Sequence, residues 1–153
     1  MKTFIASGFG AGLLWKSLFK DKKGGGSFAS LIFALLIFLL ELETIWLLLI
    51  FMLLTIIFFI SVDDDVASDD PSWITLDEII GMSLASLASP SELLPLIAGF
   101  IIFRASDILK APSIVAKMEE LPGKKGVLYD DLAAGAFGLL GATIVSQFMN
   151  LTL

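Results

Sequence analysis

Cysteine and histidine are both absent from this sequence. The absence of cysteine excludes a disulfide framework and a thiolate nucleophile, and the absence of histidine excludes Ser–His catalysis, phosphohistidine chemistry and haem ligation. Together the two absences exclude a structural zinc site. Any metal that the protein binds must be held by oxygen ligands, which favours magnesium or manganese.

Basic residues are also few. Ten Lys and Arg against sixteen Asp and Glu give a formal net charge of −6, which argues against a nucleic-acid partner. Hydrophobic residues make up 57% of the 153 residues, and the mean hydropathy is +0.93. This composition is too apolar for an ordinary soluble domain, and the length suits one compact unit. We therefore expect an all-α integral membrane protein, with one membrane-embedded domain over residues 1–153.

The apolar residues fall into long runs. The longest, from Phe28 to Val62, is interrupted only at 41–44 by Glu-Leu-Glu-Thr. As a single helix it would be about 50 Å long, well beyond the roughly 30 Å core of a bilayer. A helical hairpin with its turn at 41–44 is therefore predicted. With the later runs it gives about four apolar membrane helices, preceded by an N-terminal interfacial or re-entrant segment at 3–19.

Further helices are predicted after the acidic loop at 63–70. They are expected over 71–89, over 92–109 and from near Asp130 to the C-terminus, with a polar stretch at 111–129 between the last two. Asp70 and Pro71 suit the start of the first of these helices, as its cap and its first residue. Asp130 is likewise suited to cap the last helix.

A basic, glycine-rich stretch joins the N-terminal segment to the hairpin: Lys20-Asp21-Lys22-Lys23-Gly24-Gly25-Gly26-Ser27. Ser27 is placed to cap the helix that follows. The consecutive glycine amides before that helix could cradle a phosphate. The alternative is a flexible loop whose lysines anchor it at an anionic leaflet.

The charges are unevenly distributed along this path. All ten Lys and Arg residues fall on one side of the predicted membrane, and the opposite turns carry only Glu41, Glu43 and Glu92. This is the positive-inside pattern. It predicts that the charged loops and helix ends lie at the cytoplasmic face of the cytoplasmic membrane, together with the N-terminus.

Three acidic sites converge at that face: Asp70 with Asp77 and Glu78, then Asp107, then Asp130 and Asp131. A charged side chain at the centre of a bilayer costs roughly 2.5–3.5 kcal/mol, so a cluster of carboxylates must lie at the interface or in a wet, metal-lined cavity. Helix capping explains Asp70 and Asp130 individually, and solvation explains 63–65. Asp77 and Glu78 are harder to explain in this way, because they are expected beyond the first turn of a helix that is otherwise apolar.

Arg104, Asp107 and Lys110 follow one another at a spacing of three, so successive side chains are neighbours on one helix face otherwise built of Ile, Phe and Leu. One interpretation is an intramembrane ion pair. The other is a metal-ligating carboxylate between two cations that hold a phosphate, with Arg104 able to bind it bidentately.

Three blocks of the sequence resemble the signature blocks of the phosphatidylglycerophosphatase A family: Asp-Pro-Ser-Trp-Ile-Thr-Leu-Asp-Glu-Ile-Ile-Gly at 70–81, Phe-Arg-Ala-Ser-Asp-Ile-Leu-Lys at 103–110 and Gly-Lys-Lys-Gly-Val-Leu-Tyr-Asp-Asp-Leu-Ala-Ala-Gly at 123–135. Ser-Gly-Phe-Gly-Ala-Gly-Leu at 7–13 and Gly-Ser at 26–27 resemble that family too, and the blocks keep the same order over nearly the whole chain. The sequence departs from the family pattern at 22–24, at 111–113 and at Lys124. These departures concern loop geometry and headgroup preference more than the acidic residues.

The resemblance implies a magnesium-dependent membrane phosphatase that removes the terminal phosphate of phosphatidylglycerophosphate to give phosphatidylglycerol. It implies metal ligation by Asp70, Asp77, Glu78, Asp107, Asp130 and Asp131. Of these, Asp77, Glu78, Asp107 and Asp131 are expected to be catalytic, and phosphate binding is expected from Gly26, Ser27, Arg104 and Lys110. The ion would neutralise the phosphate and activate the attacking water, with an aspartyl-phosphate intermediate as the alternative route.

Clustered carboxylates also occur in two other kinds of protein, phosphatidyltransferases and non-catalytic cation-binding or transport proteins. A phosphatidyltransferase also uses clustered aspartates and magnesium on a lipid headgroup, but its Asp-Gly-x-x-Ala-Arg motif is missing from this sequence. A non-catalytic cation-binding or transport protein would favour carboxylates at mid-depth in the membrane, whereas these are expected at helix ends. The sequence carries no signal for an oligomeric state.

Overall fold

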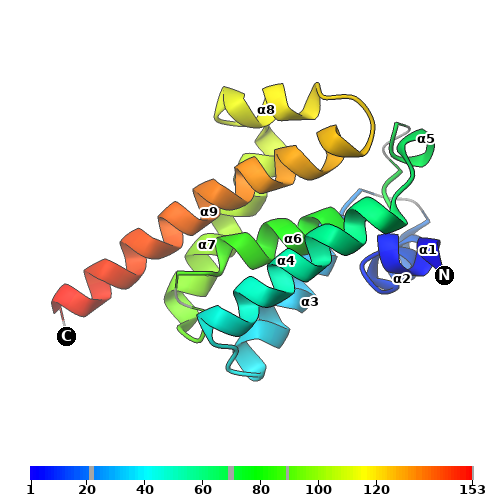
Figure 1. Ribbon diagram of the computed structural model, residues 1–153. Coiled ribbons are helices and arrows are strands. Elements are labelled where there is room, and N and C mark those ends of the chain that lie inside the picture. The colour runs from blue at the N-terminus through cyan, green and yellow to red at the C-terminus, as the bar shows by residue number, and fades with distance from the viewer. Residues whose placement is uncertain (21–22, 69–70, 89, 153) are drawn as a thin grey trace.

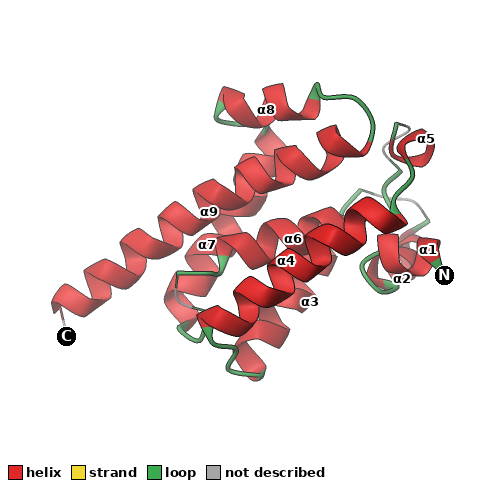
Figure 2. Ribbon diagram, viewed as in Figure 1, coloured by secondary structure: helices red, strands yellow, loops and turns green. Residues whose placement is uncertain are grey.

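The computed structural model describes residues 1–20, 23–68, 71–88 and 90–152, and the regular structure within these residues is all helical, as predicted (Figure 1, Figure 2). The helices are α1 (Lys2–Ala6), α2 (Ala11–Phe19), α3 (Gly25–Leu39), α4 (Thr44–Ser61), α5 (Asp64–Ala67), α6 (Leu76–Ala85), α7 (Leu93–Leu109), α8 (Ser113–Glu119) and α9 (Lys124–Thr152). The C-terminal part of α9 projects beyond the other helices (Figure 1).

Two helices in the described part of the chain, α4 and α9, are long and apolar enough to span a membrane. The sequence predicts about four such helices, but α3 has 15 residues, α7 has 17 and α6 only 10. A helix of 10 residues rises about 15 Å, which is half of the bilayer core. Helix α6 is therefore an internal helix and not a span.

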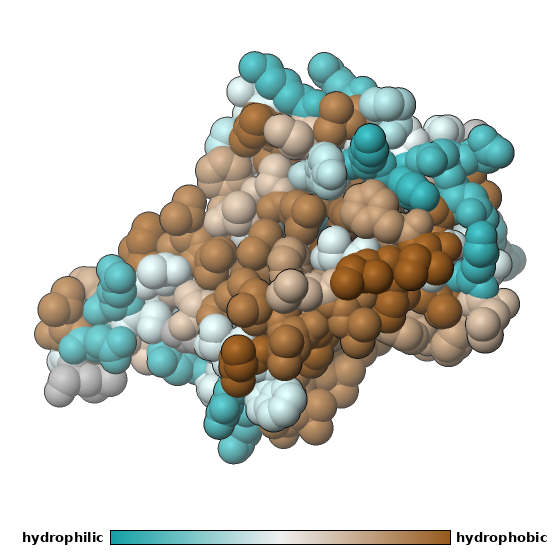
Figure 3. All heavy atoms as spheres, viewed as in Figure 1, coloured by the Kyte–Doolittle hydropathy of each residue, from teal (hydrophilic) through white to brown (hydrophobic). Residues whose placement is uncertain are grey.

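The surface of α4 is strongly apolar. Trp46, Met52 and Ile60 are 59%, 53% and 68% exposed. Hydrophobic residues cover this side of the molecule, while hydrophilic residues gather around α5 and α8 (Figure 3). Exposed apolar surface on this scale is unusual for a soluble monomer and typical of a protein that contacts lipid. The surface is thus compatible with a membrane location.

The predicted helical hairpin is present. α3 ends at Leu39, the chain turns through residues 40–43 with Glu41 at a φ of +49°, and α4 returns in the opposite direction (Figure 1). The Thr44 hydroxyl donates a hydrogen bond of 3.2 Å to the carbonyl of Leu87, which ties this turn to the chain that follows α6. Both arms of the hairpin pack against α6.

Helix α6 is the element on which its neighbours pack. It contacts α3, α4, α7 and α9, and nearly all of its residues are buried. A Cβ atom on Gly135 of α9 would lie 2.5 Å from the carbonyl oxygen of Gly81, and one on Gly138 would lie 2.7 Å from the Cβ of Ala85. Small residues let helix backbones approach closely where lipid surrounds the helices. This contact brings the acidic part of α9 next to the first turn of α6.

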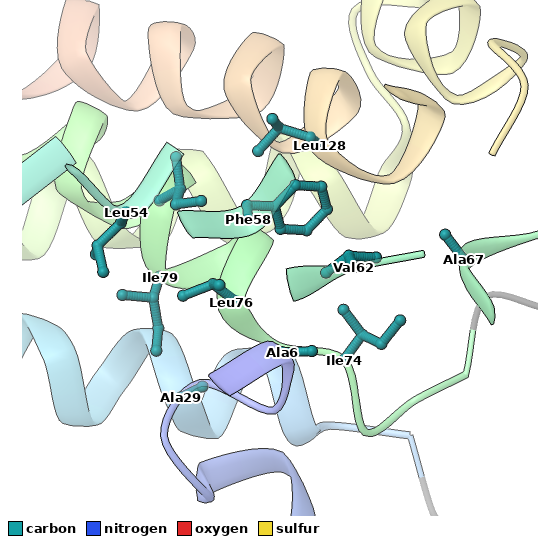
Figure 4. Close-up of a cluster of buried hydrophobic side chains, with 11 residues drawn as sticks. Ala6, Ala29, Leu54, Phe58, Val62, Ala67, Ile74, Leu76, Ile79 and Leu128 are labelled. Carbon is teal, nitrogen blue, oxygen red and sulfur yellow. The ribbon is translucent and has the colours of Figure 1, made fainter. Parts of the chain in front are cut away.

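A cluster of buried apolar side chains lies where α4, α6 and α9 meet (Figure 4). Phe58 and Val62, at the end of α4, pack with Leu76 of α6 and Leu128 of α9 in this cluster. Each of the four side chains is at most 2% exposed. The cluster fixes the start of α6 relative to the start of α9, and these two segments carry acidic residues of the candidate site.

The start of α6 corrects one prediction. The helix expected from Pro71 begins at Leu76, because residues 72–73 form a turn in which the Ile74 amide donates to the Pro71 carbonyl at 2.9 Å. The amide of the buried Thr75 then donates to the Ala6 carbonyl of α1 at 3.1 Å. Asp77 and Glu78 therefore lie in the first turn of α6 and not beyond it. The predicted cap, Asp70, lies outside the described residues.

Two further helix starts differ from the prediction. α9 begins at Lys124, so Asp130 lies inside the helix and does not cap it. The stretch expected to be polar, 111–129, contains α8, which packs against α9. α3 begins at Gly25 with Gly24 as its N-cap, so Ser27 is a helical residue and not the cap. Gly25 lies so close to the Ser72 carbonyl that a Cβ atom would be 2.9 Å from the oxygen, so this position favours glycine.

We expect Gly135→Val to destabilise the protein, because the new side chain would meet the backbone of α6 at Gly81, which cannot move aside as a flexible side chain can. Overpacking of this kind typically costs about 1–3 kcal/mol. Thermal unfolding in detergent micelles measures the effect. Ala136→Val, at the exposed neighbouring position, controls for helix propensity. Equal loss of stability in the two variants would contradict the close contact.

Candidate metal centre

Three carboxyl groups meet where α6 and α9 pack together. Asp77 and Glu78 come from the first turn of α6, and Asp131 comes from α9. Each offers one oxygen atom, and these three atoms lie within 4.8 Å of one another. Asp77 is 5% exposed and Asp131 is 3% exposed. We call these three residues the carboxylate group.

Each carboxyl of the carboxylate group has one oxygen without a hydrogen-bond partner in the described part of the chain. The buried atoms Asp77 Oδ1, Glu78 Oε2 and Asp131 Oδ1 have no hydrogen-bond partner among the described residues. A buried, unsatisfied polar atom costs about 1–3 kcal/mol, and more when the group is charged. Three such atoms in one place therefore indicate a missing positive partner.

Burial changes the proton affinity of the two α6 carboxyls. It raises the pKa of Asp77 well above its ordinary value, and the neighbouring Glu78 carboxylate adds to the effect. Burial also raises the pKa of Glu78 to about 8, with a further contribution from the charge of Asp131. Both shifts have the direction expected for carboxylates crowded together away from water.

Arg104 of α7 lies beside the carboxylate group. Its Nη2 atom forms an ion pair of 3.0 Å with Asp107 Oδ2, and its Nε donates a hydrogen bond of 3.2 Å to the hydroxyl of Ser27 on α3. The Nη1 atom is buried and has no hydrogen-bond partner among the described residues. The guanidinium is thus held in place by two contacts and keeps one donor nitrogen available.

Lys110 is bound more completely than Arg104. At the end of α7 its ammonium group donates to Asp107 Oδ1 at 3.2 Å and to Asp130 Oδ2 of α9. It also pairs with Glu119 of α8 at 3.4 Å. Lys110 therefore joins three helices through their carboxylates.

The structure brings the predicted residues together but divides them into two sets. Asp77, Glu78 and Asp131 form the carboxylate group, while Asp107 and Asp130 are paired with cations. The Asp130 Oδ1 atom also accepts a hydrogen bond of 2.8 Å from the Asp131 amide. The sequence predicts metal ligation by all five and offers an ion pair with Arg104 and Lys110 as the other interpretation of Asp107. It does not reveal that Lys110 also pairs with Asp130, which lies on another helix. The sixth predicted ligand, Asp70, lies outside the described residues.

Gly26 and Ser27 also lie at this site. A Cβ atom on Gly26 would collide with the carboxyl group of Glu78, so Glu78 packs directly on the α3 backbone. Ser27 accepts the hydrogen bond from Arg104. Sequence reasoning missed Glu119, which reaches Lys110 from α8. A helix predicted at 113–119 would have been the signal for it.

The residues fit a divalent cation. All the available donor atoms are carboxylate oxygens, which suit hard cations such as magnesium, calcium and manganese. One oxygen of each carboxyl group lies within the span that one ion can bridge, and a positive ion would relieve the repulsion among the three groups. Asp77, Glu78 and Asp131 thus form a possible metal-binding group.

Fold and site together define an all-helical protein with a membrane-compatible surface and a buried acidic site beside a held arginine, features that suit an enzyme acting on lipid phosphates. The family model for phosphatidylglycerophosphatase A matches residues 4–146, and the chain belongs to this family. The protein is therefore a phosphoric monoester hydrolase, and the resemblance found in the sequence is confirmed.

A curated relative covers the chain almost completely. It is a Bacteroides thetaiotaomicron protein provisionally named a phosphatidylinositol-3-phosphatase, and it is 33% identical over 147 residues, which are 92% of this chain and 90% of the relative. No solved structure matches the chain. Family and relative agree on a lipid phosphatase and differ in the lipid.

We expect magnesium to raise the unfolding temperature of the wild-type protein, because an ion that binds the folded state stabilises it. Asp131→Asn removes one of the clustered buried charges, so in chelator this variant should unfold at a higher temperature than the wild type, by on the order of 1 kcal/mol of stability. Its response to magnesium should be lost. Thermal unfolding in detergent with magnesium or chelator tests this, with the exposed Glu120→Gln as the control. An unchanged magnesium response in Asp131→Asn would count against the metal centre.

Proposed function

We propose that the protein is a magnesium-dependent phosphatase that hydrolyses the terminal phosphate of phosphatidylglycerophosphate to give phosphatidylglycerol and inorganic phosphate. The observation that carries this proposal is that three buried carboxylate oxygens and the Nη1 atom of Arg104 all lack a hydrogen-bond partner among the described residues. A cation at the carboxylates and the guanidinium beside them offer positive charge on two sides of a phosphate. We assign the whole chain, 1–153, to one membrane-embedded phosphatase domain.

Asp77, Glu78 and Asp131 would hold the magnesium ion. The bound ion would supply charge neutralisation and polarisation of the phosphate ester. Arg104 would donate from Nη1 to a phosphate oxygen and stabilise the charge that spreads over the equatorial oxygens during transfer to water. Because its other nitrogens are held by Asp107 and Ser27, the guanidinium needs little reorganisation to do so.

We assign a positioning role to the ion-pair network around Lys110. Asp107 bridges Arg104 and Lys110 through its two oxygens, and Lys110 extends the network to Asp130. The residue next to Asp130 is Asp131, so the network connects the arginine to the carboxylate group. Loss of Asp107 would release Arg104 and leave a buried cation unpaired, which is costly.

The placement of Arg104 argues against the non-catalytic alternative. A site that only binds or conducts a cation gains nothing from a nearby guanidinium whose Nη1 lacks a partner in the described chain, since the two positive charges repel each other. An anionic substrate accounts for both positive groups, the bound cation and the guanidinium. Among anionic lipids, phosphatidylinositol 3-phosphate is the second candidate substrate, because the relative from Bacteroides carries the name of a phosphatase for it.

We also propose that the site faces the cytoplasm. The charged residues of α5, α8 and the start of α9 lie at the site end of the molecule, whereas the α3–α4 turn at the other end carries Glu41 and Glu43 (Figure 1). A surplus of Lys and Arg at one end supports a cytoplasmic position for that end. Chemistry at this face would have direct access to magnesium and water.

We expect the purified protein to release phosphate from phosphatidylglycerophosphate in mixed micelles with magnesium and not with chelator. Asp107→Asn and Asp131→Asn should lose at least about a hundredfold in kcat/KM, the usual scale for a removed charge-stabilising contact. Arg104→Lys should be impaired to a similar degree, since an ammonium cannot keep the Ser27 and Asp107 contacts and also present Nη1. Glu120→Gln serves as the exposed control.

Parallel assays with phosphatidylinositol 3-phosphate identify the substrate. A higher kcat/KM for that lipid than for phosphatidylglycerophosphate would transfer the proposal to the second candidate. Absence of release from both lipids by a folded, magnesium-loaded protein would overturn the phosphatase proposal and favour cation binding alone.

A single cysteine tests the orientation, because the natural sequence contains none. Glu43→Cys in cells should react with a membrane-impermeant maleimide added from outside, and Lys23→Cys should react only after the membrane is opened. The reverse pattern would place the site on the external face. The wild-type protein, which has no cysteine, is treated with the same maleimide as the control for background reaction.

A further inference from the structure

An apolar groove lies between the N-terminal segment and the helical hairpin. Its volume is about 540 Å³, within the range of about 300–1,000 Å³ that is typical of small-ligand sites. The walls are formed by Gly8 to Leu14, by one face each of α3 and α4, and by Ile79 of α6. All the residues that line it are Gly, Ala, Leu, Ile or Phe, so an occupant must be apolar.

The groove starts beside the carboxylate group. At its polar end lie Ile79, the residue after Glu78, and Ala29, one helical turn beyond Gly26. The carboxyl group of Glu78, a member of the carboxylate group, packs on the Gly26 backbone of the same helix that lines the groove. From Ala29 the groove follows α3 as far as Leu36, a rise of about 10 Å. It therefore leads from the level of the site toward the middle of the hairpin.

The glycine-rich stretch 7–13 forms the outer wall. Gly8, Phe9 and Gly10 have positive φ values of 61°, 57° and 97°, which turn the chain between α1 and α2. Phe9 and Leu14 stand at the rim and are 51% and 49% exposed. Exposed apolar side chains at the rim suit a groove that opens into lipid and not into water.

We propose that this groove holds an acyl chain of the same lipid whose phosphate binds beside Arg104. The inference rests on the proposed function, which requires one molecule to place a phosphate at the carboxylate group and hydrocarbon next to it. The direction of the groove matches a chain that runs from the interface into the bilayer. A partner helix is excluded by size, since a helix is about 10–12 Å wide and would need more volume over this length than the groove offers.

The first test compares substrates of two chain lengths. Leu36→Trp fills the groove from an exposed position on α3, and Leu35→Trp, on the same helix but outside the groove, is the matched control. For a dipalmitoyl lipid phosphate, kcat/KM should fall about tenfold in Leu36→Trp, the low end of discrimination by a hydrophobic pocket. For the dihexanoyl analogue, kcat/KM should be the same in Leu36→Trp as in the wild type. In Leu35→Trp, kcat/KM should be unchanged for both lipids. Equal loss for both chain lengths would overturn the proposal.

A binding measurement separates this proposal from the proposed function. A phosphatidylglycerophosphate analogue with a diazirine in one acyl chain, irradiated with the protein in magnesium or chelator, should label 9–14 and 29–36, and Leu36→Trp should abolish that labelling. A photoreactive diacylglycerol without phosphate should label the same peptides weakly. Equal labelling by the two lipids, or labelling confined to the outer face of α4, would overturn the proposal. Lack of hydrolysis with labelling intact would instead overturn only the phosphatase activity.

Discussion

The close backbone contact between α6 and α9 is the constraint on which the site depends. At Gly81 and Gly135 the two helices approach until a single added methyl group would meet the backbone of the other helix. The same contact sets Asp77 and Glu78 opposite Asp131, although like charges resist such placement. The apolar cluster around Phe58 and Leu128 packs α4 against the starts of α6 and α9, which carry these carboxyl groups. Packing thus holds together charges that electrostatics alone would separate.

The carboxylates of the site fall into two sets, one paired with cations and one with unpartnered oxygens in the described chain. Asp107 and Asp130 are neutralised by Arg104 and Lys110, while the carboxylate group keeps oxygens that lack partners within the described chain. Arg104 in turn keeps one donor. A cation on one side and a phosphate between cation and arginine would satisfy both. This complementarity agrees with membership of a phosphatase family whose substrates are lipid phosphates, and the apolar groove provides hydrocarbon surface at the same level.

Much of the fold was predictable because it follows from local pattern. The hairpin follows from a run too long for one span and interrupted by two glutamates, and α7 follows from the apolar run after Glu92. The starts of α6 and α9 were not predictable in this way. Thr75 is bound by the Ala6 carbonyl, which lies far away in sequence, and this delays α6 until Leu76. Helix α9 already begins at Lys124, where α8 packs on it. Asp130 therefore lies inside α9, and the capping signal at this residue is overridden.

The sequence by itself determined the chemistry that is available: oxygen ligands only, six acidic positions in three blocks, Arg104 and Lys110 on either side of Asp107, and enough apolar surface for a membrane. These are properties of residue type and spacing, which local order preserves. Only the tertiary structure decided which carboxylates are paired, which remain without partners in the described residues, and that Arg104 keeps one free donor. Those outcomes depend on contacts between α3, α6, α7 and α9, and distances between residues so far apart in the chain are set by packing and not by sequence spacing.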